Sequence, residues 1–336
     1  DVTTARTLLH EAIPVTGSIV SGTYSDNNIK NYTHGIFQSV YDYPFLSSSA
    51  NHIFDLSVGY SANSALSASS AVTEQSKKIN MYNQMAQVLV GYDITGSILE
   101  FDEDGNIADG GTKLRECLFI DFSRLLYKDE VKKGSFSLDL GVTTAYATPF
   151  TTTITLADTN AANDYRVNSP AGEYAILTAS GGGVTGTPNA GLIYYQAGIA
   201  VVTASVLGSL LTAPSVEVNS SAELINAVLT GSAISGSCDD LRHRVKDIAF
   251  NNTTELNSTI YFCRINNNDF NYSANPTYLS ESKLRVKRTT TDAPVSYITT
   301  VGLYSDDNEL LAVAKLSEPL RKDPTNEMIL RVRLDY

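Results

Sequence analysis

The sequence predicts a mainly β protein with a few helices (α+β), built from antiparallel sheets or a sandwich core that carries a smaller inserted β-rich module. Three observations support this prediction. Residues 330–336 alternate strictly between apolar and polar side chains, and further runs rich in β-branched and aromatic residues end at turn-forming residues. Charged residues make up only 18% of the chain, and Ser, Thr, Asn and Gly take their place.

The 336 residues are long enough for about two domains. Residues 1–145 are expected to form an N-terminal α+β part of the main core, and residues 238–336 a C-terminal β-meander that completes it. Residues 146–237, rich in Thr, Ala, Gly and Ser, are expected to form the smaller module, consistent with an insertion. The flanking strands, predicted at 135–142 and 244–250, should then lie close in space.

Residues 1–49 predict irregular or β structure, with short apolar runs such as 12–20 and 36–43, and residues 52–60 alternate as a strand does. A helix is predicted from a Thr73 cap to Gly91, because apolar residues recur there at three- and four-residue spacing. Residues 102–106 are predicted to form a hairpin turn, residues 129–133 a short helical turn and residues 135–142 a strand. The apolar residues that define the long helix are Ile79, Tyr82, Met85, Ala86 and Leu89.

In the middle segment we expect strands at 151–156, 174–178, 192–195 and 199–206, the last two as a hairpin, and a helix over 220–229. Further along, strands are expected at 259–265, 296–304 and 309–316, of which the last two form a hairpin. The final strand should bury one face, which carries Leu330, Val332, Leu334 and Tyr336, and expose Arg331 and Arg333.

No catalytic, cofactor-binding or metal-binding residue is predicted, and no enzyme activity is expected. The acidic stretch from Asp102 to Asn106 lacks the ligand register of an EF-hand. Residues 181–186 match G-x-G-x-x-G without a following helix, which favours a plain loop. Residues 238–243 combine thiol, carboxylate and imidazole groups, but such sites are assembled in space. The histidines, His10, His34, His52 and His243, have no metal-site spacing.

Charge and cysteine usage narrow the range of partners. A net charge of −12 argues against general nucleic-acid binding, and the basic run at 283–288 alternates like the wet face of a strand. Cys117, Cys238 and Cys263 lie far apart, so we expect reduced thiols with neither disulfide nor zinc site. Residues 198–211 are too short and too interrupted for a membrane span, and no signal peptide is expected. The chain starts at Asp1 rather than Met, so it is trimmed, processed or incomplete, and the sequence does not choose among these.

Five stretches, at residues 77–87, 122–136, 191–199, 260–273 and 300–317, resemble virion structural proteins of marine contractile-tailed phages, the cyanophage and pelagiphage type related to T4-like phages. The resemblance implies a multicopy, non-enzymatic virion subunit of the tail, baseplate or neck. Its partners would be copies of itself and other virion proteins, assembled in the host bacterial cytoplasm. The alternatives are a head-associated decoration protein, or an adhesin whose middle module binds a host-surface receptor or carbohydrate. The Asn- and Tyr-rich loop at 266–272 suits a wet protein interface or simply makes turns.

Overall fold

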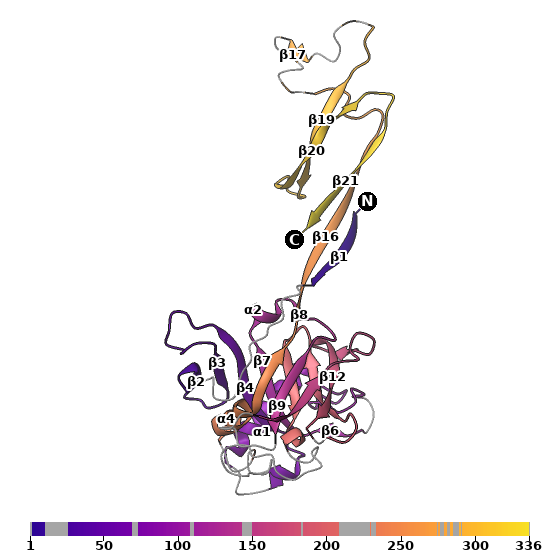
Figure 1. The fold of residues 1–336 in the computed structure, drawn as a ribbon. Coiled ribbons are helices and arrows are strands. Elements are labelled where there is room, and N and C mark those ends of the chain that lie inside the picture. Colours follow the sequence, from indigo (N-terminus) through magenta and orange to yellow (C-terminus); the bar gives the residue numbers. More distant parts are fainter. Residues whose placement is uncertain are drawn as a thin grey trace. The chain divides into compact units, whose positions relative to one another are not determined.

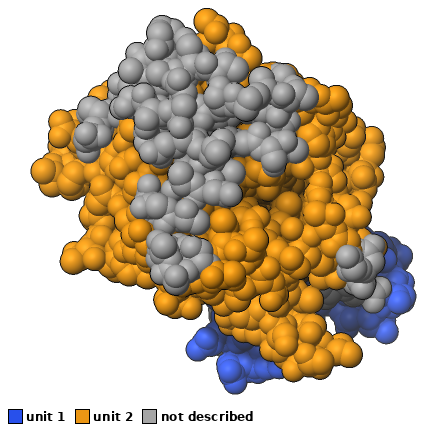
Figure 2. Space-filling model, turned by 90° about the horizontal axis from the view of Figure 1, so that it is seen from below, with its two compact units in different colours: residues 1–8, 255–336 blue, residues 9–254 orange. Residues whose placement is uncertain are grey.

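The structure, a computed structural model, is mainly β and forms two compact units. Unit 1 contains residues 1–8 and 255–336, and unit 2 contains residues 9–254; they are coloured separately in Figure 2. The structure describes residues 2–10, 26–68, 73–107, 111–142, 150–182, 184–207, 229, 233–273, 275, 279–280, 283–284, 289 and 291–335.

One antiparallel sheet dominates the described part of unit 2, with strand order β15-β9-β10-β12-β13-β14-β7-β4-β3-β2 and β11 paired to β12 (Figure 1). Several neighbours in this order, such as β12, β13 and β14, are also consecutive along the chain. Their bounds are β2 (Ile29–Asn31), β3 (Gln38–Tyr41), β4 (His52–Tyr60), β7 (Glu116–Phe122), β9 (Ser137–Val142), β10 (Thr152–Ala157), β11 (Arg166–Ser169), β12 (Gly172–Gly181), β13 (Asn189–Tyr194), β14 (Ile199–Thr203) and β15 (Val245–Ala249).

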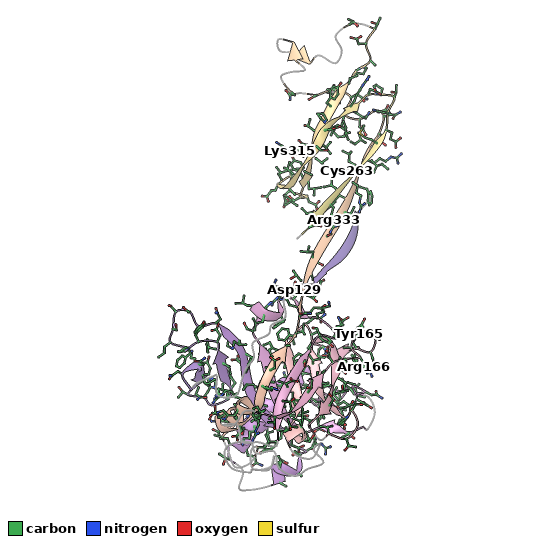
Figure 3. The ribbon with its side chains drawn as sticks, in the orientation of Figure 1. Asp129, Tyr165, Arg166, Cys263, Lys315 and Arg333 are labelled. Carbon is green, nitrogen blue, oxygen red and sulfur yellow. The ribbon has the colours of Figure 1, made fainter. Side chains whose placement is uncertain are left out.

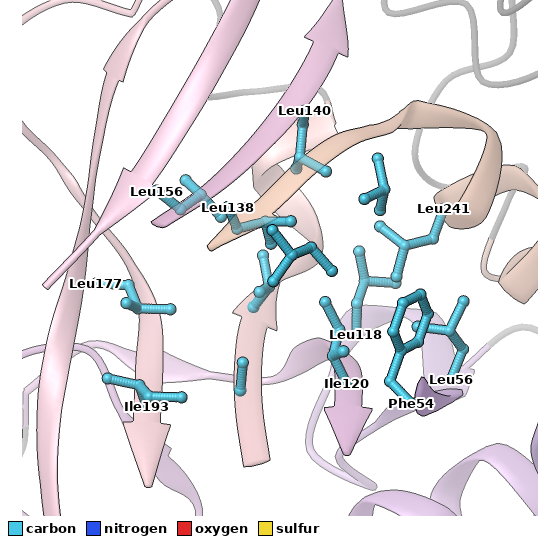
Figure 4. Packing of buried hydrophobic residues seen from close by; sticks show 14 of the residues in the cluster. Phe54, Leu56, Leu118, Ile120, Leu138, Leu140, Leu156, Leu177, Ile193 and Leu241 are labelled. Atoms are coloured by element: carbon cyan, nitrogen blue, oxygen red, sulfur yellow. The ribbon is translucent and has the colours of Figure 1, made fainter. Parts of the chain in front are cut away.

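The central strands bury both faces, because alternate residues of one strand enter different cores. On β7, Leu118 and Ile120 belong to the larger core and Cys117 and Phe119 to the smaller one. The larger core also receives side chains from β9, β10 and β15 at the other end of the strand order, such as Leu138 and Leu156, and Figure 4 shows these two in one cluster with Phe54, Leu56 and Leu118. The sheet therefore curls around the larger core.

Within the described residues, two helices of more than two turns cover the sheet. Helix α4 (Ile234–Arg244) packs against β4, β9 and β15 and so joins the two ends of the curled sheet. Helix α1 (Gln75–Leu89) packs on β4 over the smaller core. It lies so close to β4 that a Cβ placed on Gly59 would stand 2.6 Å from the Lys78 carbonyl oxygen and 2.8 Å from the Tyr82 nitrogen. Glycine at position 59 therefore sets the distance between helix and sheet.

Shorter elements complete unit 2. The two-stranded pair of β5 (Phe101–Asp102) and β6 (Lys113–Leu114) flanks the acidic turn, and β8 (Glu130–Val131) pairs with the first residues of β16. The remaining elements are the short helix α2 (Arg124–Tyr127) and the 3-10 turns η1 (Asp26–Asn28), η2 (Ala65–Ala68) and η3 (Ala204–Leu207).

In unit 1, the strand order is β1-β16-β21, and β19 and β20 form a separate two-stranded sheet. β17 and β18 pair only with each other. The bounds are β1 (Val2–His10), β16 (Asn252–Ile265), β17 (Leu279–Ser280), β18 (Lys283–Leu284), β19 (Ser296–Tyr304), β20 (Leu310–Lys322) and β21 (Met328–Asp335).

The predicted mainly β fold is confirmed, and the structure divides the chain into units at other places than the predicted domain boundaries. The flanks of the 146–237 segment do lie together, since β15 pairs with β9. The segment is not a separate module, however, because its strands β10 to β14 continue the sheet from β9 to β7. Nor do residues 238–336 complete the main core, because unit 1 begins at Glu255. Backbone hydrogen bonds and shared burial, not composition, define the units.

Most of the predicted elements in the described residues are confirmed. The helix ends before Gly91, whose positive φ of 94° suits a helix end, although Glu74 and not Thr73 occupies the N-cap. The hairpins β13–β14 and β19–β20 are present. Two predictions are wrong: residues 130–131 form a strand and not part of a helical turn, and β21 pairs with β16 and not with the preceding hairpin. In addition, residues 234–244 form a helix that the sequence pattern does not indicate. The apolar run at 12–20 lies outside the described residues, as does the helix predicted at 220–229 apart from residue 229.

Candidate functional site

Unit 1 exposes apolar side chains that a stable core would bury. Among its described residues, Ile260 and Ile265 are the buried apolar ones. Within the residues that the structure describes, nine large apolar side chains of unit 1 are exposed, against eight in the much longer unit 2, so the apolar surface is concentrated here. We call the following residues the unit 1 apolar surface: Phe270, Tyr272, Tyr297, Tyr304, Leu310, Leu311, Val313, Leu320 and Ile329.

The C-terminal strand alternates as predicted but is not buried as predicted. Leu330, Val332 and Leu334 are only partly buried, while Arg331 and Arg333 are exposed, and Tyr336 lies outside the described residues. Figure 3 labels Arg333 on this strand. The apolar face of β21 is thus shielded from water only in part, and no core covers it among the described residues.

The β19–β20 hairpin also buries its apolar side chains only in part. Val301 faces Ala314 and Leu303 faces Ala312 across the strands, and all four are only partly buried. A two-stranded sheet of this kind is marginally stable by itself in water. Both of its long strands also have an edge that no described strand covers, which makes them templates for further pairing.

Polar contacts fix one end of this hairpin. Lys322 is fully buried, and its Nζ donates to the Asn267 carbonyl at 3.0 Å, to Asn271 Oδ1 at 2.7 Å and to the Asp323 carbonyl at 2.8 Å. The loop at 266–272 is therefore fastened to β20. Within this loop, Asn271 Nδ2 donates to the Asn267 carbonyl, which is the role that asparagine has in turns. The side chains of Phe270 and Tyr272 in the same loop are exposed.

The formal charge is divided unevenly between the units. Unit 1 has 11 Lys and Arg and 12 Asp and Glu residues, a net charge of −1, so unit 2 carries −11 of the total of −12. Electrostatic repulsion between two copies of unit 1 is therefore weak, which favours association of identical units.

A second candidate is a cavity of about 280 Å³ in unit 2, between α1 and the sheet. Asp55 on β4 and Asp121 on β7 face each other directly across the two strands and both line it. Asp55 accepts a hydrogen bond from Ser39 Oγ at 2.5 Å, and its Oδ1 lies 2.8 Å from His52 Nε2. The remaining lining residues are Phe37, Leu56, Ser57, Met81, Met85 and Phe119.

The two carboxylates differ in their surroundings. Partial burial, and then the charge of Asp55, raise the pKa of Asp121 to about 6. The hydrogen bond with Asp55 raises the pKa of His52. No hydrogen bond to the Asp121 carboxylate occurs within the described part of the chain, whereas Asp55 has two partners. Asp121 therefore bears a charge that is disfavoured in the folded protein.

Asp121→Asn should stabilise unit 2 by about 1–2 kcal/mol at pH 8, after allowance for partial exposure, and have little effect below pH 4. Above about pH 6 the carboxylate is charged in both states and the folded state bears the desolvation cost; below about pH 4 it is protonated in both. Stability from this group is thus lost as pH rises. Urea unfolding of both proteins from pH 4 to 8 measures it, and a difference that is constant with pH would contradict it.

The motifs considered in the sequence do not converge on a site. Asp102 forms an ion pair with Lys113 at 2.5 Å and accepts from the Asp104 nitrogen, as in a turn. Gly181 ends β12, and the next element after the motif is strand β13, which begins at Asn189 and is not a phosphate-binding helix. Cys238 is buried, its thiol donates to the Leu56 carbonyl, and burial raises its pKa, so it is a poor nucleophile. Among the described histidine side chains, His52 contacts the cavity residue Asp55 and His34 packs against the cavity residue Phe37, while neither histidine lines the cavity itself. The side chain of His10 is outside the described residues.

Excess EDTA should leave the melting temperature unchanged. The sequence has no ligand set with structural spacing, and the described residues include no group of three or more His, Cys, Asp or Glu placed to hold a metal ion. Melting curves with EDTA, calcium and zinc test this. A rise in melting temperature with calcium or zinc would contradict it, because a bound metal stabilises the folded state.

Across the described residues, no helix has the length and apolar character needed to cross a lipid bilayer. No protein-family model matches the chain, and no curated protein or solved structure is significantly similar to it.

Proposed function

We propose that this protein is a non-enzymatic structural subunit that assembles with copies of itself through unit 1. The observation that supports the proposal is the unit 1 apolar surface together with the scarcity of buried apolar residues in the described part of that unit. Burial of apolar area is the main driving force for protein association, and obligate subunit interfaces resemble a domain core divided between the partners.

A second copy is the partner that the composition of unit 1 favours. The surface combines tyrosines with leucines and an isoleucine, and aromatic residues are enriched at interfaces. The near-neutral charge of unit 1 allows close approach of identical units, and the edges of β19 and β20 that no described strand covers can extend a sheet between copies.

The proposed setting is a phage virion, in the tail, baseplate or neck, with other virion proteins as additional partners. This part depends on the resemblance of residues such as 260–273 and 300–317, which lie in unit 1, to virion structural proteins. An exposed aromatic groove in the middle segment would favour the adhesin alternative. Of the described tyrosines there, Tyr174, Tyr194 and Tyr195 are buried and Tyr165 is exposed, so the buried ones do not favour it.

Leu311→Asp should weaken self-association at least about tenfold, because it places a charge in an apolar contact. Leu311 is 68% exposed in the single chain, so the folded subunit itself should lose little stability. Leu46→Asp is the matched control, since Leu46 is 87% exposed but belongs to unit 2. Sedimentation velocity over a concentration series measures association. A wild-type protein that stays monomeric, or a Leu311→Asp variant that assembles normally, would refute the proposal.

A further inference from the structure

The cavity in unit 2 that Asp55 and Asp121 line, here called the acidic cavity, has features of a binding site. It contains no residue of the unit 1 apolar surface. It is lined by two carboxylates, two aromatic rings and two methionines, and none of its described lining residues is basic. A cavity of about 280 Å³ is at the lower limit for small-molecule sites, so it suits one long side chain better than a whole cofactor.

The spacing of the two carboxylates favours a planar cation as the ligand of this cavity. Asp55 and Asp121 are direct partners on antiparallel strands, where facing Cβ atoms lie about 4.5–5.5 Å apart. A guanidinium group has five N–H donors in a flat fork and can engage both carboxylates at once. An ammonium is a compact and strongly hydrated charge, so it matches this pair less well.

The other walls fit the rest of an arginine side chain. Phe37 and Phe119 line the cavity, and guanidinium groups pack favourably against aromatic rings. Met81 and Met85 of α1 are flexible apolar side chains that can adapt to the aliphatic stem.

The protein's own cations do not fill this role in the described residues. Lys30 lies in the same cross-strand row, as the partner of Ser39, which in turn faces Asp55. The Lys30 Nζ, however, lies over the Tyr32 ring, 4.8 Å from the ring centre, and does not line the cavity. His52 contacts Asp55 and leaves Asp121 without a hydrogen bond from the described residues. Asp121 thus has the capacity to accept hydrogen bonds from outside.

We propose that this cavity is a docking site for an arginine side chain presented by a partner polypeptide. The charge of the carboxylate pair is complementary to a guanidinium group, and binding would relieve the unfavourable charge of Asp121 by giving it donors. The site lies wholly within unit 2, so its test does not depend on assembly through unit 1.

The experiment titrates the full-length protein with a blocked Gly-Arg-Gly tripeptide and follows backbone amide shifts by NMR. Two matched peptides replace arginine by citrulline, which has the same shape but no charge, or by lysine. We expect shifts at β4, β7 and α1 with the arginine peptide, binding about tenfold weaker for lysine, and none detectable for citrulline.

Asp121→Asn should weaken binding of the arginine peptide at least about tenfold, and the variant should remain folded because it loses a desolvated charge. Glu103→Gln is the control, since Glu103 is an acidic residue of unit 2 outside the cavity. Binding should also weaken as pH falls below about 6, where Asp121 becomes protonated and loses its negative charge. The titratable groups that interact electrostatically with Asp121 are Asp55, His52 and Tyr127.

Three results would overturn the proposal. They are no binding of the arginine peptide to the intact protein, equal binding by wild type and Asp121→Asn, and equal binding of the citrulline peptide. A further arm uses free L-arginine. If it binds as tightly as the blocked peptide or more tightly, the site takes the free amino acid and the assignment to a polypeptide is wrong.

Discussion

A chain in which a short Gly/Ser linker replaces residues 143–243 should fail to fold. The linker would join β9 to β15, which are neighbours, so the connection itself is feasible. The deletion would remove β10 to β14, however, and with them every described pairing that connects β9 to β7. It would also remove α4, which joins the two ends of the curled sheet.

The larger core loses about half of its described members in this deletion, among them Ile154, Leu177, Ile193 and Leu241. A typical protein is stable by only about 5–15 kcal/mol, and burying one large aliphatic side chain contributes about 1.5–3 kcal/mol. The loss therefore far exceeds the available stability. Circular dichroism and size exclusion should show an unfolded or aggregated chain.

A matched control replaces the exposed turn at 305–308 of the β19–β20 hairpin by Asn-Gly, which is compatible with a tight hairpin turn. This change is expected to leave the main thermal transition in place. If the chain lacking residues 143–243 instead melted cooperatively near the wild-type temperature, the sheet order given for unit 2 would be wrong.

Gly59→Val should destabilise unit 2 by about 3 kcal/mol or more, because the new side chain overlaps backbone atoms of α1 that cannot rotate away. A Cβ at residue 59 would stand 2.6 Å from the Lys78 oxygen and 2.8 Å from the Tyr82 nitrogen. The helix must move off β4, which opens the smaller core at Tyr82, Ala86 and Leu89. For a unit of this size, the melting temperature should fall by about 6–12 °C.

Gly59→Ala should give a smaller loss in the same direction, since it adds the Cβ alone. Val88→Ala is the control on the other side of the helix, where Val88 is 61% exposed, and should change stability by less than about 0.5 kcal/mol. Wild-type melting of Gly59→Val would mean that α1 does not lie against β4.

The sequence predicts strands well where one face is apolar and the other polar. Residues 52–60 and 137–142 form strands as their alternation indicates, and the helix ending before Gly91 follows its three- and four-residue spacing. Helix α4 has no such pattern, because Ser, Gly, Asp and Arg dominate it and its buried positions include Arg242 and Arg244. Such a helix depends on its tertiary contacts more than on local preference.

Neither the domain boundaries nor the acidic cavity could be predicted from sequence. The change of composition at residue 146 reflects a weakly charged set of strands within one sheet, and strand order is not encoded in composition. Asp55 and Asp121 are far apart in the chain and become neighbours only through the register of β4 with β7. Nor does the alternation of apolar and polar residues in unit 1 predict that few apolar residues of its described part are buried, because a partly buried strand face and a fully buried one have the same sequence pattern.

The joining of the curled sheet by α4 has a consequence for the order of folding during synthesis. Cys238 of this helix contacts the Leu56 carbonyl, and Asp239 accepts a hydrogen bond from Gln38 Nε2, across sequence separations of 182 and 201 residues. At about 5–20 residues per second, the ribosome needs roughly 10–40 s to make the chain between them. During that interval β2, β3 and β4 exist without α4, and their apolar face has no helix to cover it. Contacts of such long range also slow folding. Unit 2 should therefore acquire its native core late, after residue 250 has left the ribosome, and the nascent chain should be most prone to aggregation before then.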